Sequence, residues 1–128
     1  SLLPDLVKHF SLSCPEDFVA LLHHHFEKAV IATAASLVLD RAQDDPLAAD
    51  IARAAINELV QLLGSVMRQM PLSPPCAALA GGVMEHNAWL RSRLIDRLAL
   101  DYPGLKVVLG PGDAVRGACM LARTAWRT

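Results

Sequence analysis

The chain has 128 residues, of which 53% are hydrophobic and 5% aromatic, and its formal net charge is -1 at pH 7. This length allows one hydrophobic core and is too short for two large domains. The near-neutral charge and the scattered arginines argue against a nucleic-acid partner, which needs a clustered basic surface. The longest apolar stretch, Ala29 to Leu39, is too short to span a bilayer, so we expect no membrane partner.

The amino-terminal part of the chain is predicted to form helices separated by short breakers. Pro4 is expected to start a brief helix toward Phe10, and Ser13 is expected to cap a second helix with Pro15 in its first turn. The apolar residues that would form a buried stripe further along are Leu21, Leu22, Phe26, Val30 and Ile31. We therefore expect a helical amino-terminal half.

A polar cluster from Gln43 to Pro46 is predicted to end one helix and to cap the next, with Asp44 and Asp45 as the capping pair. That next helix runs to about Met70 and would be about 37 Å long. Its predicted buried face consists of Leu47, Ile51, Ala55, Leu59, Leu62, Val66 and Met70. Prolines at 71, 74 and 75 are then expected to stop it.

The carboxy-terminal part has the order strand, turn, helix, repeated twice. Cys76 to Ala80 is an apolar run typical of a parallel strand that is covered on both faces. Gly81 and Gly82 then allow a tight turn in which the backbone can approach a ligand closely. Asn87 is the predicted start of a helix that reaches about Leu100, with apolar positions at Trp89, Leu90, Leu94, Ile95 and Leu98.

After a breaker at residues 102–104, the second strand is predicted from Leu105 to Leu109. A Gly110-Pro111-Gly112 turn follows, and Asp113 is the predicted cap of a final helix that begins near Ala114. Two consecutive strand-helix units indicate a parallel sheet, whose ligands bind beyond the carboxyl ends of the strands. Both glycine loops fall there, although glycine pairs also serve merely to turn the chain tightly.

Other polar residues have plain structural explanations. His23, His24 and His25 point about 100° apart on a helix and cannot converge on one metal ion. Glu85 and His86 either are solvated or contact a ribose or purine. Gly117, Ala118 and Cys119 are expected to pack the last helix tightly against the sheet. The odd number of cysteines, Cys14, Cys76 and Cys119, favours reduced thiols and a cytoplasmic protein.

Three segments, LAGGVMEHNAWLRSRL, YPGLKVV and RGACMLA, resemble the carboxy-terminal lobe of the N-acetylglucosamine kinase and benzoyl-CoA-reductase-type ATPase family, within the actin, sugar kinase and chaperone-ATPase superfamily. The segment from Ala42 to Leu59 is also similar, with Asp44 where the family usually has glycine. The resemblance covers most of the chain after about Ala29. The residues at the family's characteristic positions are Leu79, Gly81, Gly82, Val83, Asn87, Leu90, Gly117 and Ala118.

This resemblance implies an α/β fold: a helix-rich fragment of a ribonuclease-H-like lobe with a short parallel sheet. Residues 1–128 would form a single partial domain, mainly helical over 1–75 and strand-helix-strand-helix over 76–128. It implies the nucleotide-binding part of an ATP-dependent amino-sugar kinase, inactive alone, with Gly81, Gly82, Val83 and Asn87 as cofactor-binding residues. ATP and Mg²⁺ would be bound mainly by parts of the family's enzymes that this sequence lacks, and neither catalytic residues nor metal ligands are expected here.

Two alternatives stay open. An ATPase activator of the same superfamily usually carries closely spaced cysteines for an iron-sulfur cluster, which Cys14, Cys76 and Cys119 are not. A non-enzymatic helical interaction module would expose its apolar helix faces and would not bind adenine nucleotides. The partners expected for the kinase are a small-molecule sugar and a nucleotide in the full-length protein, and a homodimer also remains open.

Overall fold

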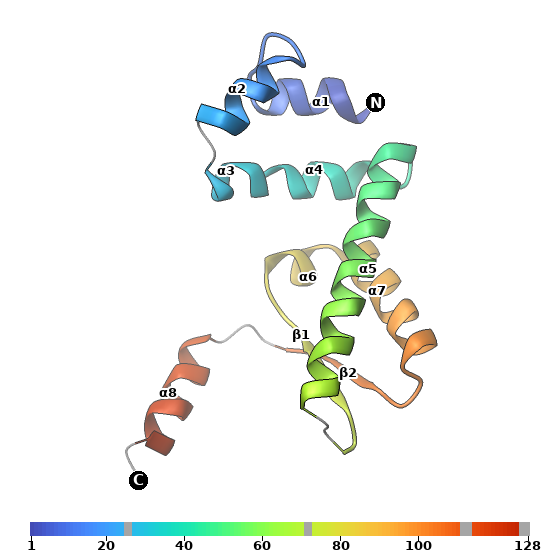
Figure 1. The fold of residues 1–128 in the computed structure, drawn as a ribbon, viewed down its shortest axis with the longest axis vertical. Helices are drawn as coiled ribbons and strands as arrows, with labels where there is room; N and C mark the ends of the chain where they lie inside the picture. Colours follow the sequence, from blue (N-terminus) through green and yellow to red (C-terminus); the bar gives the residue numbers. More distant parts are fainter. Residues whose placement is uncertain (25–26, 71–72, 111–113, 126–128) are drawn as a thin grey trace.

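The computed structural model describes residues 1–24, 27–70, 73–110 and 114–125 of the chain (Figure 1). The helices in chain order are α1 (Leu2–His9), α2 (Asp17–His24), α3 (Lys28–Ala32), α4 (Ala34–Arg41), α5 (Pro46–Gln69), α6 (Gly82–His86), α7 (Ala88–Asp101) and α8 (Ala114–Ala125), and the strands are β1 (Cys76–Leu79) and β2 (Lys106–Leu109). The predicted class, a helix-rich α/β fold with a short parallel sheet, is confirmed.

The two strands pair in parallel, with Cys76 opposite Lys106 and Leu79 opposite Leu109. The pairing continues past both ends of the ladder: the Lys106 N–H donates to the Pro75 carbonyl at 2.9 Å, and the Gly110 N–H donates to the Leu79 carbonyl at 3.0 Å. Helices α6 and α7 connect the strands. The predicted strand-helix-strand order is therefore confirmed, with β2 beginning one residue later than expected.

The start of α5 is determined by Asp45. Its Oδ1 accepts hydrogen bonds from the N–H groups of Leu47 at 3.0 Å and Ala48 at 3.1 Å, two donors that have no partner inside the helix. Pro46 occupies the first helical position, where the missing N–H costs nothing. Of the predicted capping pair Asp44 and Asp45, Asp45 is the N-cap, and the predicted length of the helix is confirmed.

The buried face of α5 is not the predicted one. The side chains that α5 buries recur every four residues, at Ala48, Ala52, Ile56, Val60 and Gly64. Small residues on this face let α5 pack closely against α4 and α7. Most of the larger side chains of the predicted face are exposed, including Leu62 at 62% and Leu47 at 57%. The prediction was wrong because α5 is apolar on two sides, and side-chain size did not indicate where its neighbours lie.

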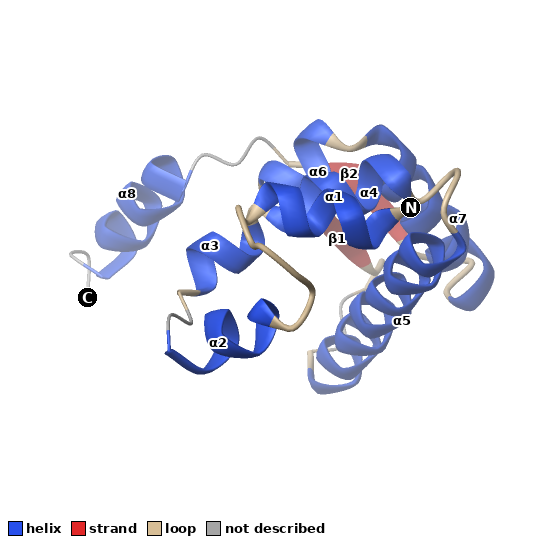
Figure 2. Ribbon diagram, turned by 90° about the horizontal axis from the view of Figure 1, so that it is seen from above, coloured by secondary structure: helices blue, strands red, loops and turns tan. Residues whose placement is uncertain are grey.

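The core lies between α4, α5 and α7. Helix α7 contributes Leu90, Leu94 and Leu98, which are all buried, as the spacing predicted. Gly64 of α5 faces Tyr102, and a Cβ at this glycine would collide with the tyrosine hydroxyl. The absence of a side chain at Gly64 is therefore what lets the end of α7 pack against α5. Figure 2 shows the sheet beneath the helices in a second view.

Among the described residues, mainly one face of the sheet is covered. Leu79 and Val107 pack against the core cluster, whereas Cys76 and Ala78, which point to the other face, are exposed. The expectation of a strand covered on both faces was wrong, because α8 stands apart from the sheet in both ribbon views (Figures 1 and 2).

The amino-terminal helices also differ from the prediction. Helix α2 begins at Asp17 rather than near Pro15, and the Asp17 carboxylate accepts hydrogen bonds from the N–H groups of Ser13 at 2.9 Å and Cys14 at 3.2 Å. An aspartate rather than Ser13 thus organises this turn. The predicted buried stripe was wrong at Leu22 and Val30, which are exposed in the part of the chain that the structure describes.

Several predicted features lie outside the described residues: Phe26, His25, the stop at Pro71, the Pro111-Gly112 part of the second glycine turn, and the cap at Asp113. Within the described residues, no helix is both long enough and apolar enough to cross a membrane.

Candidate functional site

The Gly81-Gly82 turn connects β1 to α6 through a backbone conformation that requires glycine. Gly81 has φ 98° and ψ 158°, which L side chains rarely adopt. Its N–H donates to Glu85 Oε1 at 3.2 Å, and its carbonyl accepts from the Glu85 N–H at 2.9 Å. Glu85 therefore stabilises the turn. This observation favours a structural role for Glu85 over contact with a ribose or purine.

At Gly82, by contrast, neither the backbone conformation nor the packing requires a glycine. A Cβ at Gly82 would meet only His86 Cδ2, at 4.0 Å, which is ordinary van der Waals contact. The packing of the described residues therefore leaves open space above the backbone of Gly82. A group from outside the chain could approach the backbone closely at this point.

Asn87 separates α6 from α7 and starts α7, as predicted. Its Oδ1 accepts a hydrogen bond from the Leu90 N–H at 2.8 Å, so the side chain is the N-cap of α7. Arg91 supports the same junction, because its Nη1 donates to the carbonyls of Met84 at 2.5 Å and Glu85 at 3.2 Å. The side-chain oxygen of Asn87 thus already accepts a hydrogen bond from the fold, and its NH2 group is a donor only.

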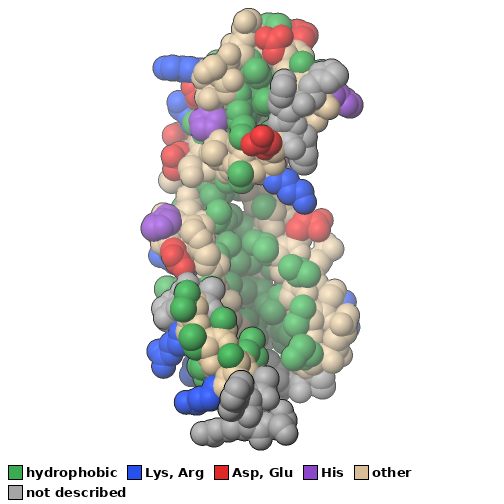
Figure 3. Space-filling model, turned by 90° about the vertical axis from the view of Figure 1, so that its left-hand side faces the viewer, with side chains coloured by type: hydrophobic (Ala, Val, Ile, Leu, Met, Phe, Trp, Pro, Cys, Tyr) green, Lys and Arg blue, Asp and Glu red, His purple; other side chains and the backbone are tan. Residues whose placement is uncertain are grey.

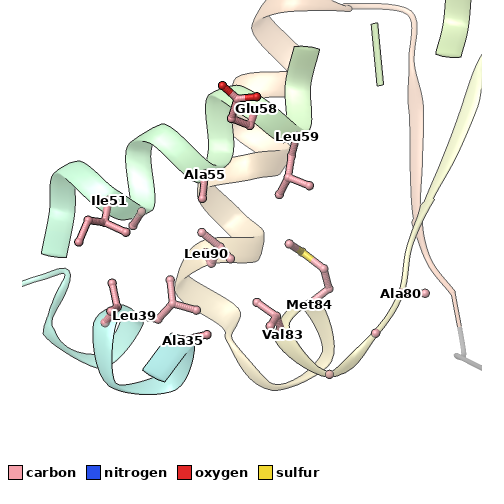
Figure 4. A pocket seen from close by; sticks show the side chains of 14 residues that line it. Ala35, Leu39, Ile51, Ala55, Glu58, Leu59, Ala80, Val83, Met84 and Leu90 are labelled. Atoms are coloured by element: carbon pink, nitrogen blue, oxygen red, sulfur yellow. The ribbon is translucent and has the colours of Figure 1, made fainter. Parts of the chain in front are cut away.

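An apolar pocket with a volume of about 680 Å³ lies beside the glycine turn. Helices α4 and α5 form two of its walls, and α7 contributes Leu90 (Figure 4). The turn and the start of α6 close the remaining side with Gly81, Gly82, Val83 and Met84. Three of the four predicted cofactor-binding residues therefore border one cavity.

Asn87 borders a second, smaller pocket of about 320 Å³. The two pockets share the backbone of the turn and the inner side of α4, because both are lined by Ala35, Leu39, Gly82 and Val83. The smaller pocket is the more polar one, with Ser36, Asp40, His86 and Asn87 in its lining. The predicted site residues thus meet at the junction of an apolar and a polar hollow.

The charges at these two pockets are acidic. Glu58 stands on the α5 side of the larger pocket, with its carboxylate directed away from Leu90 and Met84 (Figure 4). Asp40 borders the smaller one, and the described residues of both linings include no lysine or arginine. Such a site can hold an uncharged ring and accept hydrogen bonds from hydroxyl groups at its edge. It does not supply positive charge for a phosphate.

Most of the apolar wall was not predicted as part of a site. The sequence pattern places Ile51, Ala55 and Leu59 on the core face of the long helix and does not mark Ala35 and Leu39 of α4 as site residues. One sequence feature could have predicted this wall: α5 is apolar on two sides. It therefore has more apolar surface than one contact with the core needs.

The remaining candidates lie elsewhere. Cys14 precedes α2, Cys76 is in β1 and Cys119 is in α8, and all three are free thiols. Cys119 is exposed, and a Cβ at Gly117 would meet no atom within 4 Å, so the tight packing predicted for α8 was wrong. Within the described ranges, no three His, Cys, Asp or Glu side chains gather into a group that could hold a metal ion.

Comparisons with models of protein families, with curated proteins and with solved structures give no match. Any assignment of function therefore depends on the residues of the site and their geometry.

Proposed function

We propose that this chain is the carboxy-terminal, nucleotide-binding part of an ATP-dependent amino-sugar kinase, built as part of a ribonuclease-H-like lobe. The observation that carries the proposal is the position of the Gly81-Gly82-Val83 turn at the rim of the apolar pocket. This is the carboxyl end of a parallel strand, where open α/β sheets bind their ligands.

The dimensions of the pocket suit a nucleoside. Its volume of about 680 Å³ falls in the range of small-molecule sites, which is roughly 300–1,000 Å³. An adenine ring would lie among the side chains of Leu39, Leu59 and Leu90. The ribose would approach the uncovered backbone of Gly82.

The residues that line the site also explain why we expect the chain alone to be inactive as a kinase. Phosphoryl transfer requires charge neutralisation, usually by Mg²⁺ and basic residues, together with a group that orients the nucleophile. Among the described residues that line the two pockets, the imidazole of His86 is the only basic group for the first task. In the proposed enzyme, the phosphates, the metal and the sugar are held by the other parts of the protein.

The binding test uses two alanines of α5 that are both exposed. Ala55 lines the pocket and Ala54 does not, so Ala55→Trp fills the cavity and Ala54→Trp is the matched control. We expect saturable binding of ATP and adenosine in calorimetric titrations, weakened about tenfold or more by Ala55→Trp only, which corresponds to about 1.4 kcal/mol or more. An unmodified chain that binds neither compound would refute the proposal.

The activity test uses the purified chain alone. We expect no transfer of phosphate from ATP to N-acetylglucosamine or glucosamine in a coupled assay. Measurable turnover would contradict the assignment to a lobe without catalytic residues.

A second candidate function is a non-enzymatic helical interaction module. The exposed apolar side chains of α5, such as Leu62 and Val66, favour it, because such surfaces commonly mark contacts with other proteins. The titration separates the two candidates, since an interaction module would bind a protein partner and no adenine nucleotide.

A further inference from the structure

A second apolar surface continues along α5 from the pocket of the glycine turn, which it meets at Leu59. We define the α5 face as Leu59, Leu62 and Val66 of α5 with Met70 just after it, all of which are exposed. It adjoins a hollow of about 300 Å³ between α5, β1 and α7. Figure 3 shows hydrophobic side chains gathered along this side of the molecule, around a hollowed middle. From Leu59 to Met70 the face is about 17 Å long.

Helix α8 has an apolar side of similar length. At 100° per residue, Val115, Ala118, Cys119 and Ala122 fall on one side of the helix, with Leu121 at its margin. Val115 is 75% exposed, and the small residues around it would permit a close approach to another helix. The 12 residues of α8 span about 18 Å, which matches the length of the α5 face.

The charges beside the two surfaces are opposite. Helix α8 contains Arg116 and Arg123 and no acidic residue. Because these arginines are seven residues apart, both lie along the same edge of its apolar side. On α5, Glu58 borders the α5 face, whereas the basic Arg68 lies on the opposite side of the helix and donates to Ser65 at 3.0 Å.

We propose that α8 of a second copy of this chain docks on the α5 face, and that the two copies exchange α8 reciprocally in a closed two-fold dimer. Helix α8 stands clear of its own α5 (Figure 1), so the α8 that reaches this face comes from another copy. Reciprocal exchange covers both apolar surfaces of both copies at once and leaves none free for further growth. This is helix-in-groove recognition, with apolar anchors for affinity and charged edges for orientation.

The first test is the molar mass in solution, measured by light scattering after size exclusion. We expect a dimer for the unmodified chain and a monomer for both Val115→Asp and Leu62→Asp, because each substitution would bury an unpaired charge. Leu100→Asp is the control, since Leu100 is exposed on α7 and belongs to neither surface. A monomeric unmodified chain would overturn the proposal, including the case in which α8 folds back onto its own α5.

Mixing the variants tests the reciprocal arrangement. The Val115→Asp chain keeps an intact α5 face, and the Leu62→Asp chain keeps an intact α8, so an equimolar mixture should form a heterodimer although each variant alone is monomeric. Circular dichroism of each variant verifies folding. A mixture that stays monomeric, or a dimer that survives both substitutions, would place the interface elsewhere. The outcome of the dimer test is independent of the outcome of the nucleotide titration, because the substituted residues Leu62 and Val115 do not line the pocket of the glycine turn.

Discussion

The backbone N–H of Leu2 donates a hydrogen bond of 2.8 Å to the carboxylate of Asp45, joining the start of α1 to the start of α5 across 43 positions of the sequence. Nearby, Asp5 of α1 pairs with Arg41 of α4 at 2.8 Å. Asp45 therefore has two roles, because one of its oxygens caps α5 and the other fixes α1. Together with the Asp5–Arg41 pair, this side chain ties α1 to the helices that follow it.

Asp45 should make stability depend on pH. The hydrogen bond from the Leu2 N–H, followed by that from Ala48, lowers the pKa of the Asp45 carboxyl. Its stabilisation is therefore fully present above the unfolded-state pKa and is lost as the pH falls through the lowered folded-state pKa. Urea unfolding across the acid range should show stability decreasing in that window.

Asp45→Asn is the matched variant for this prediction, because it keeps an acceptor oxygen and removes the ionisable group. We expect a shallower loss of stability with acid in this variant, whereas Asp45→Ala should lower the Tm at every pH. An unchanged acid profile in Asp45→Asn would show that other carboxyl groups cause the dependence.

The two faces of α5 provide a comparison between identical residues. Ile56 is 8% exposed and Ile51 is 44% exposed. Ile56→Ala should destabilise the protein by about 2–5 kcal/mol through lost burial and a cavity, and Ile51→Ala by less than about 1 kcal/mol. Chemical denaturation measures both. Equal losses would mean that both faces of α5 are covered in solution.

The paired glycines should respond differently to alanine. Gly81→Ala forces a side chain into the φ 98° conformation and should cost about 1–3 kcal/mol, whereas Gly82→Ala has room for its methyl group and should change stability by less than about 0.5 kcal/mol. Thermal unfolding tests the difference. If the nucleotide proposal holds, Gly82→Ala weakens ATP binding in the titration while the fold stays intact.

Asn87 should behave as a helix cap. Asn87→Ala removes the acceptor of the Leu90 N–H and should destabilise the protein by about 1 kcal/mol, whereas Asn87→Asp keeps an acceptor and most of the stability. Both variants are measured by thermal unfolding and by ATP titration. A loss of ATP binding in Asn87→Asp at unchanged stability would assign this side chain a contact with the ligand as well.

The elements that the sequence predicted best are those with local causes. Asp45 and Pro46 start α5, and Asn87 starts α7, because a cap needs only a side-chain oxygen and the first helical N–H groups. The alternation of short apolar runs with glycine turns likewise predicted two parallel strands. The four predicted site residues lie around two adjoining pockets. They do so because the turn that follows a parallel strand lies at the carboxyl end of the sheet.

What only the tertiary structure decided is which of several apolar surfaces becomes buried. Helix α5 is apolar on two sides, and the choice of Ala52 and Ile56 over Ile51 and Leu59 depends on where α4 and α7 lie. The same choice leaves Ile51 and Leu59 to line the pocket beside Gly82, so the wall of the site follows from packing. The sequence by itself determined where α5 and α7 begin, because their caps are local hydrogen bonds. Burial is a property of neighbours distant in the sequence, and the hydrophobic effect that drives it has no direction of its own.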